Sequence, residues 1–171
     1  MKVGFINGAK QIARIAVMSA TLIVGKFALS FIPNIEVVTT LVIVYAFVFK
    51  YDCVFATLVF CTADAFIYPP TIDVIVSYFI YWNLLSILVA TLSELKVKNF
   101  SVYLVVGLIM TVLFGVITSL LYSLFYGVNF FAIYVAGLYF YALQLVSTLV
   151  FMLVGFKPLT KVLLKIKQKI Q

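Results

Sequence analysis

Long apolar segments fill most of this 171-residue sequence, and only short polar stretches separate them. A helix needs about 20 apolar residues to cross the hydrocarbon core of a bilayer. Hydrophobic residues make up 66% of the chain and charged residues 10%, whereas soluble domains are about half apolar and a quarter charged. We therefore expect an all-α membrane protein with one domain over residues 1–171, a bundle of six transmembrane helices. The predicted helices cover residues 10–31, 37–49, 53–67, 74–92, 101–125 and 130–155.

The basic residues are distributed unevenly along this pattern. If the N-terminus is cytoplasmic, six crossings place eleven of the 12 Lys and Arg residues on the cytoplasmic side and leave Lys26 on the other. Cytoplasmic loops of membrane proteins are enriched in Lys and Arg. The charges therefore predict cytoplasmic N- and C-termini in the plasma membrane, with residues 1–9 as a cytoplasmic N-terminus. We interpret the net charge of +7 as a topology signal, and not as a nucleic-acid-binding surface.

The C-terminal segment, residues 157–171, forms a predicted basic amphipathic cytoplasmic tail that begins at Lys157 and Pro158. Its lysines alternate with apolar residues. That pattern is typical of a helix that lies on the membrane surface and is held there by anionic lipid. Docking against a protein partner is the alternative.

Several classes of chemistry are excluded by what the sequence lacks. It contains no histidine, the commonest metal ligand and general base, and no GxxxxGK[ST] phosphate loop. Cys53 and Cys61 lie eight residues apart in one predicted helix, roughly 12 Å along its axis, which is too far for a disulfide. We expect no metal site, no cofactor and no enzymatic activity.

Asp64 is the one carboxylate predicted to lie inside a membrane-spanning helix. An ionisable group at that depth costs a few kcal/mol unless it has a partner or water. It is therefore a candidate binding residue. The alternative is a carboxylate that reaches the outer membrane interface, since Asp64 lies about one turn from the end of its predicted helix.

Other candidate binding residues are aromatic or carry amides. Trp82 falls near the middle of a predicted helix, the wrong depth for an interfacial anchor, so it either stacks on a flat ligand or packs between helices. Asn83 and Gln144 lie at membrane depth and bond either a ligand or another helix. Tyr141 belongs to a group of tyrosines towards the outer half, which form either an aromatic belt or an outward-opening pocket.

Small residues lie on one face of the first predicted helix, where Ala16 and Ala20 are four residues apart. This spacing lets another helix approach closely. The Ala16-xxx-Ala20 pattern is followed by a segment from Gly25 to Asn34 and by Thr39. The later motifs are Ala63-Asp64-Ala-Phe leading through Pro70-Thr71 to Trp82, Tyr134-Val-Ala-Gly137-Leu-Tyr-Phe140, and Lys157-Pro158-Leu159. In this order the motifs resemble the substrate-binding (S) components of energy-coupling factor transporters, over nearly the whole chain.

The resemblance implies a six-helix subunit that binds a vitamin or vitamin precursor at the outer face for an ABC importer. It implies a transmembrane coupling subunit, met by the face of Ala16 and Ala20, and two cytoplasmic ATPases that drive uptake. The substrate-binding residues expected on this basis are Asn34, Asp64, Trp82, Asn83, Tyr141 and Gln144. The alternative function is a structural membrane scaffold of the MreD cell-shape type, which is similar in size and helix number and needs no ligand.

Overall fold

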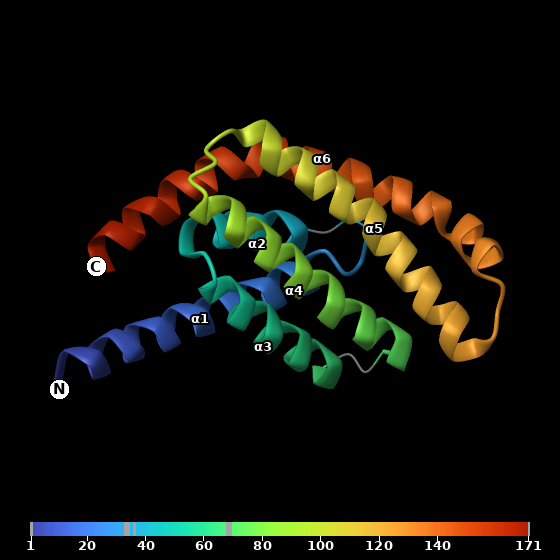
Figure 1. The fold of residues 1–171 in the computed structure, drawn as a ribbon, viewed down its shortest axis with the longest axis horizontal. Coiled ribbons are helices and arrows are strands. Elements are labelled where there is room, and N and C mark those ends of the chain that lie inside the picture. Colours follow the sequence, from blue (N-terminus) through green and yellow to red (C-terminus); the bar gives the residue numbers. More distant parts are fainter. Residues whose placement is uncertain (1, 33–34, 36, 68–69, 171) are drawn as a thin grey trace.

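The computed structural model describes residues 2–32, 35, 37–67 and 70–170, and these residues form six helices and no strand. The helices are α1 (Lys2–Ala28), α2 (Val38–Phe49), α3 (Asp52–Ile67), α4 (Ile72–Glu94), α5 (Phe100–Tyr126) and α6 (Phe130–Ile170) (Figure 1). The predicted all-α class is therefore confirmed for the described part of the chain.

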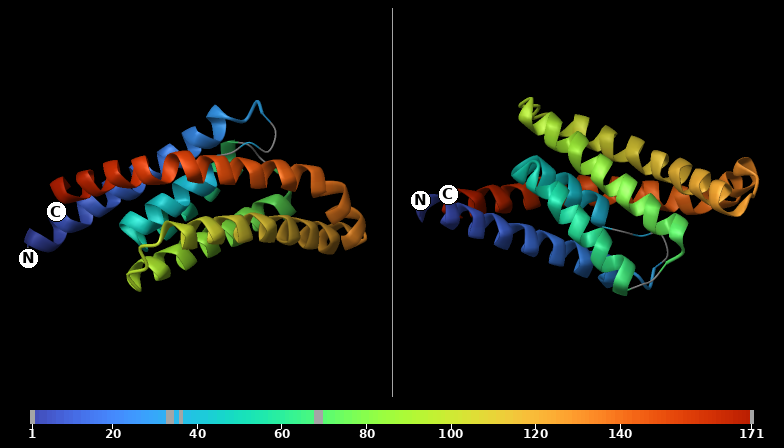
Figure 2. Two further views of the ribbon diagram at one scale, coloured as in Figure 1. Left: turned by 90° about the horizontal axis from the view of Figure 1, so that it is seen from above. Right: turned by 60° about the horizontal axis from the view of Figure 1, so that its bottom comes forward.

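Successive helices run in opposite directions along the molecule. Both termini lie at one end, together with the α2–α3 and α4–α5 connections, and the α5–α6 connection lies at the other (Figures 1 and 2). We call these the terminal end and the distal end. Lys50, Lys96 and Lys98 lie in the two connections at the terminal end, whereas Lys26 lies in the last turn of α1, towards the distal end. The side of the membrane that each end faces stays a prediction.

Four of the helices are long and apolar enough to cross a membrane. These segments are Gly8–Ala28, Ile72–Glu94, Phe100–Tyr126 and Phe130–Lys169. With 12 and 16 residues, α2 and α3 extend roughly 18 and 24 Å, less than the hydrocarbon thickness of about 30 Å. The structure thus supports four of the six predicted crossings on length and composition, and the other two remain predictions.

The short α2 lies at the centre of the bundle, packed against each of the other five helices. Ten of its 12 residues are buried. Because protein surrounds α2, its carboxyl-terminal backbone must be bonded by protein groups. The Ser93 hydroxyl donates to the Phe47 carbonyl at 2.7 Å, and the Lys167 ammonium donates to the Val48 carbonyl at 2.7 Å.

The first and last helices are longer than the sequence predicts. The expected start of the first helix at residue 10 is wrong, because α1 begins at Lys2. The expected end at residue 155 is also wrong, because α6 continues through Pro158 to Ile170. Its 41 residues extend about 62 Å, twice the hydrocarbon thickness. The basic segment is therefore a continuation of α6 (Figure 2).

Candidate functional site

Asp64, which is buried, forms an ion pair with the partly exposed Lys26 near the distal end. The Lys26 ammonium lies 2.7 and 2.6 Å from the two carboxylate oxygens of Asp64. The Asp64 side chain is 3% exposed and that of Lys26 is 26% exposed. Such short, charge-assisted bonds are stronger than neutral ones. Asp64 is therefore neutralised by a partner on α1, and the cation reaches the surface more readily than the anion.

The ring of Tyr78 on α4 lies against this ion pair and belongs to a cluster of aromatic side chains. The Lys26 ammonium lies 4.4 Å from the centroid of the Tyr78 ring, close enough for a cation–π interaction. Trp82 contacts Tyr78, Tyr81 and Phe60, with centroid distances of 6.4, 4.6 and 6.0 Å. The contact with Phe60 of α3 agrees with the alternative interpretation of Trp82 as a residue that packs between helices.

The indole N–H of Trp82 is buried. The residue is 2% exposed, and its Nε1–H has no hydrogen-bond partner within the part of the chain that the structure describes. A buried donor that lacks an acceptor costs about 1–3 kcal/mol. This N–H is therefore a buried donor whose hydrogen-bonding capacity the described residues leave unused.

Asn83 is bonded within the helix bundle. The Thr57 hydroxyl of α3 donates to Asn83 Oδ1 at 3.1 Å, and Asn83 Nδ2 donates to the Phe79 carbonyl of its own helix at 2.7 Å. The amide thus links α3 to α4. This geometry agrees with the interpretation of Asn83 as a helix-packing residue.

Tyr141 lies at the interface between α5 and α6. Its hydroxyl is 2.9 Å from the Ser119 hydroxyl. Its ring occupies space left by two glycines, because a Cβ atom would come within 2.9 Å of the ring at Gly115 and 2.5 Å at Gly137. Gln144, one turn further along α6, is buried. Tyr141 therefore takes part in packing between α5 and α6, and Gln144 is buried on the same helix.

An aromatic layer connects the two groups of predicted residues. Phe114 of α5 lies against Tyr78 and Tyr81, with centroid distances of 6.0 and 4.8 Å. Phe114 immediately precedes Gly115, which contacts Tyr141. Contacts thus run from Lys26 on α1 through Tyr78 and Tyr81 on α4 and Phe114 on α5 to Tyr141 on α6.

The remaining predicted residues lie elsewhere or are not described. Asn34 lies outside the described residues. Ala16 and Ala20 are exposed on α1, in a stripe at four-residue spacing with Ile12 and Val24. An exposed apolar stripe on a membrane helix contacts either lipid or another helix.

Sequence reasoning missed two groups at this end of the molecule. Lys26 was recognised only as the cation outside the positive-inside pattern, yet a carboxylate within a helix bundle needs a partner and Lys26 was available. The predicted helix over residues 74–92 leaves out Asp73, but Asp73 is buried in the first turn of α4 and accepts a hydrogen bond from the Tyr126 hydroxyl at 3.1 Å.

The spacing of charges contained a further signal. Arg14 pairs with Asp52, and Lys26 pairs with Asp64. In both cases the acid follows the base by 38 positions, as expected for two parallel helices in contact. That constant offset between opposite charges would have identified Lys26 as the partner.

Within the described residues, no group of three or more His, Cys, Asp or Glu side chains could hold a metal ion. Comparisons of the chain with family models, curated proteins and solved structures find no match. Because fold alone does not fix function, a function must be argued from the site.

Proposed function

We propose that this chain is the substrate-binding membrane subunit of an importer of the energy-coupling factor type, capturing a vitamin or vitamin precursor. The observation that supports this most is the Lys26–Asp64 pair, in which a buried carboxylate meets an ammonium that also lies against the Tyr78 ring. Charged side chains inside a membrane bundle are costly and usually mark a solute pathway or binding site. The solute would bind at the distal end, above this pair.

The proposed ligand contacts follow from the donors at the site. A lysine ammonium has three N–H donors, and two of those of Lys26 point at Asp64. The remaining Lys26 donor and the Trp82 indole N–H suit a solute with a carboxylate or carbonyl group. Tyr78 and Trp82 would flank its flat, apolar part.

The proposed topology has six crossings with both termini in the cytoplasm. Two features support it: the termini share one end of the molecule (Figure 1), and nearly all basic residues fall at that end in the sequence pattern. The distal end then faces outwards, which is where an importer's binding subunit must meet its solute.

Uptake would depend on partners. The sequence contains no GxxxxGK[ST] motif, so we propose that two cytoplasmic ATPases supply the energy through a transmembrane coupling subunit. The exposed stripe at Ala16 and Ala20 supports α1 as the contact surface, because small residues permit close helix approach.

The binding test uses a variant that keeps the fold. Replacing both members of a buried ion pair by apolar residues is often neutral for stability, so Lys26→Met with Asp64→Leu removes the charges together. Purified protein is heated with a panel of vitamins and precursors. A solute at 100 times its Kd stabilises by about 2.7 kcal/mol, which raises the Tm by about 5–10 °C. We expect one panel member to do so for the natural sequence and not for the double variant.

Thr62→Ala is the matched control, since Thr62 is exposed on α3 and its hydroxyl donates to the Leu58 carbonyl of the same helix. It should keep the full ligand response. If no panel member shifts the Tm of the natural sequence, or if the double variant responds equally, the proposed binding site is wrong.

The partner test uses α1. Ala16→Leu with Ala20→Leu should abolish co-purification of ATPase subunits from the native membrane, because bulky side chains block close helix approach. Ile12→Leu with Val24→Leu, on the same stripe, changes little in volume and should retain the partners. Retention of the ATPases by both variants would place the interface elsewhere.

A structural scaffold is the second candidate. The observation that favours it is that Asn83 and Tyr141 both bond other helices. A scaffold requires no solute, so cells with the Lys26→Met, Asp64→Leu double variant would keep normal shape and growth. Loss of vitamin-dependent growth in those cells, with shape unchanged, would instead favour the binding subunit.

A further inference from the structure

A second polar feature lies at the terminal end, away from the proposed solute site. The carboxyl end of α2, the α4–α5 connection and α6 line an open cavity of about 680 Å³. We call it the lysine pocket. The described residues that line it include six lysines: Lys50, Lys96, Lys98, Lys157, Lys161 and Lys167.

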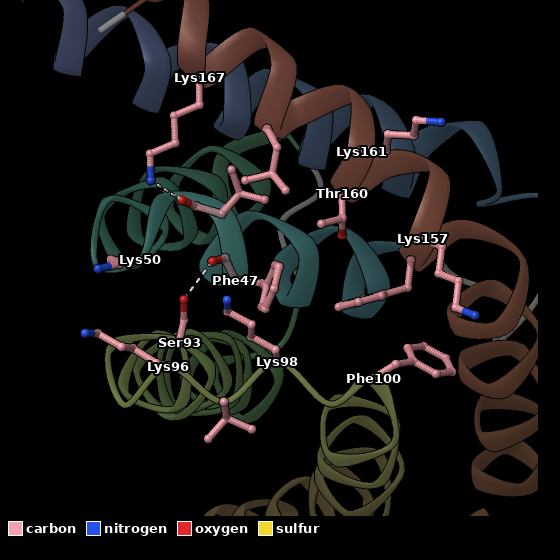
Figure 3. Close-up of a pocket in the computed structure, with 14 residues that line it drawn as sticks. Phe47, Lys50, Ser93, Lys96, Lys98, Phe100, Lys157, Thr160, Lys161 and Lys167 are labelled. Carbon is pink, nitrogen blue, oxygen red and sulfur yellow. Dashed lines mark hydrogen bonds between the residues drawn. The ribbon is translucent and has the colours of Figure 1, made fainter.

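The lysines approach the cavity from several sides (Figure 3). Lys98 and Lys167 point inwards, and Lys50 and Lys96 lie along one margin. Lys157 and Lys161 extend outwards from α6. The positive charge of the pocket is therefore contributed by three separate segments of the chain, brought together only by the fold.

Most of this charge has no counterpart in the protein. In the described part of the chain, the ion pair recorded for these lysines is that of Lys50 with Glu94, at 2.9 Å. Lys167 bonds a neutral carbonyl, and the Lys157 ammonium lies 5.8 Å from the Phe100 ring centroid. Like charges held together repel one another, so a bound anion would relieve the repulsion.

The pocket also has an unpartnered polar group and an apolar wall. Thr160 is 9% exposed, and its hydroxyl has no hydrogen-bond partner among the described residues. It lines the cavity next to Phe156 and Leu164 of the same helix, with Phe100 and Val97 facing them. The cavity therefore offers donors for an anion and an apolar surface for an attached chain.

The depth of the pocket decides between a soluble anion and a lipid. Its wall includes Ser93, next to the end of the candidate span Ile72–Glu94, and Phe100, where the span Phe100–Tyr126 begins. The ends of membrane-spanning segments lie at the level of the lipid headgroups. Basic pockets between helices on the cytoplasmic side are known to take anionic headgroups.

We propose that the lysine pocket binds the phosphate headgroup of an anionic phospholipid. Lys96, Lys98 and the Thr160 hydroxyl bond the phosphate, the other lysines add positive charge around it, and the glycerol and first acyl carbons lie against Phe100 and Phe156. This site is independent of the solute site at the distal end.

The test measures thermal unfolding in micelles that contain increasing fractions of phosphatidylglycerol or, separately, phosphatidylcholine. Lys96→Gln with Lys98→Gln removes two pocket charges from an exposed connection. Lys165→Gln with Lys169→Gln removes two charges from exposed positions of α6 that do not line the pocket. The net charge changes equally in the two variants, so they separate a defined pocket from general surface attraction.

We expect phosphatidylglycerol, and not phosphatidylcholine, to raise the Tm of the natural sequence. One lysine near a membrane surface contributes about 1 kcal/mol, or roughly fivefold in affinity. The Lys96, Lys98 variant should therefore need about 25-fold more phosphatidylglycerol for half of the effect, and the Lys165, Lys169 variant should match the natural sequence.

Thr160→Val gives a second measurement that does not alter charge. It should weaken the phosphatidylglycerol effect about fivefold, the equivalent of one hydrogen bond. Equal losses in the two lysine variants would overturn the pocket in favour of diffuse attraction. Equal protection by inorganic phosphate or pyrophosphate without lipid would overturn the lipid as the ligand.

Discussion

The Lys26–Asp64 pair predicts an asymmetric response to removal of each partner. Lys26→Met leaves the Asp64 carboxylate, with 3% of its side chain exposed, buried without a counter-charge. Breaking a buried pair in this way costs about 3–5 kcal/mol. Asp64→Asn leaves Lys26, which at 26% exposure can turn its ammonium towards the surface along its aliphatic stem. That change should cost about 1–2 kcal/mol.

These energies convert into melting temperatures. For a chain of this length, 1 kcal/mol shifts the Tm by about 2–4 °C. Lys26→Met should lower the Tm by about 6–20 °C and Asp64→Asn by about 2–8 °C. The Lys26→Met, Asp64→Leu double variant should lie near the natural sequence, because no charge is left buried.

Trp82 provides the assay. It is the only tryptophan in the sequence, it is buried, and it contacts Tyr78, against which Lys26 packs. Its fluorescence during heating therefore reports unfolding next to the pair. A larger loss for Asp64→Asn than for Lys26→Met, or a double variant as unstable as the worse single variant, would refute the reasoning from burial.

Further predictions concern helix packing, the centre of the bundle and topology. Gly137→Ala should destabilise the protein by about 1–3 kcal/mol in thermal unfolding, because its new Cβ would come within 2.5 Å of the Tyr141 ring. Gly8→Ala is the contrasting variant, because a Cβ there would meet nothing within 4 Å. It should stabilise α1 by about 0.5–1 kcal/mol in the same assay. Ser93→Ala should cost about 1 kcal/mol in chemical denaturation, because a carbonyl of α2 loses its donor. Both native cysteines are buried, so they should not react with an impermeant maleimide applied to intact cells. With the proposed topology, the maleimide should label Val128→Cys and leave Leu95→Cys unlabelled until the membrane is opened. Labelling of Leu95→Cys from outside would reverse the proposed topology.

The inner helix boundaries were predictable because strong local breaks set them. The polar turn that begins at Lys50 ends α2, and Lys50 itself has φ 57°, a left-handed conformation that cannot continue a helix. The predicted range 37–49 therefore differs from α2 by one residue. Such boundaries are set by residues within a few positions of the helix end, and these residues can be read directly from the sequence.

The end of α6 was not predictable in this way, because packing opposes the local preference. A proline inside a helix costs about 3 kcal/mol, so Pro158 indicated a helix end. The structure continues the helix, since Leu159 and Leu163 pack against the buried core and Lys167 bonds the end of α2. The partner in that bond is 119 residues away, and no local pattern reveals it.

The candidate site was predicted only in part, because most of its contacts also join residues that are distant in the sequence. Asp64 could be identified because a carboxylate in an apolar segment is anomalous by itself. The sequence could not reveal the bond from Thr57 to Asn83 or the contact of Tyr141 with Gly115. These contacts depend on how α3 packs against α4 and how α5 packs against α6. Sequence therefore indicated which residues are unusual, and only the structure distinguished those bonded to other helices from those with free donors.

The two ion pairs between α1 and α3 limit how a signal could cross the membrane. Arg14 and Lys26 are 12 residues apart, as are Asp52 and Asp64, so the pairs are about 18 Å apart along two parallel helices. Between them, the Ser19 hydroxyl of α1 donates to the Ala56 carbonyl of α3 at 3.1 Å. Sliding α1 by one turn would break all three contacts at once, so we expect α1 and α3 to move as one unit. A partner bound to the exposed face of α1 would therefore act on the proposed solute site by tilting or rotating this unit against α4, α5 and α6.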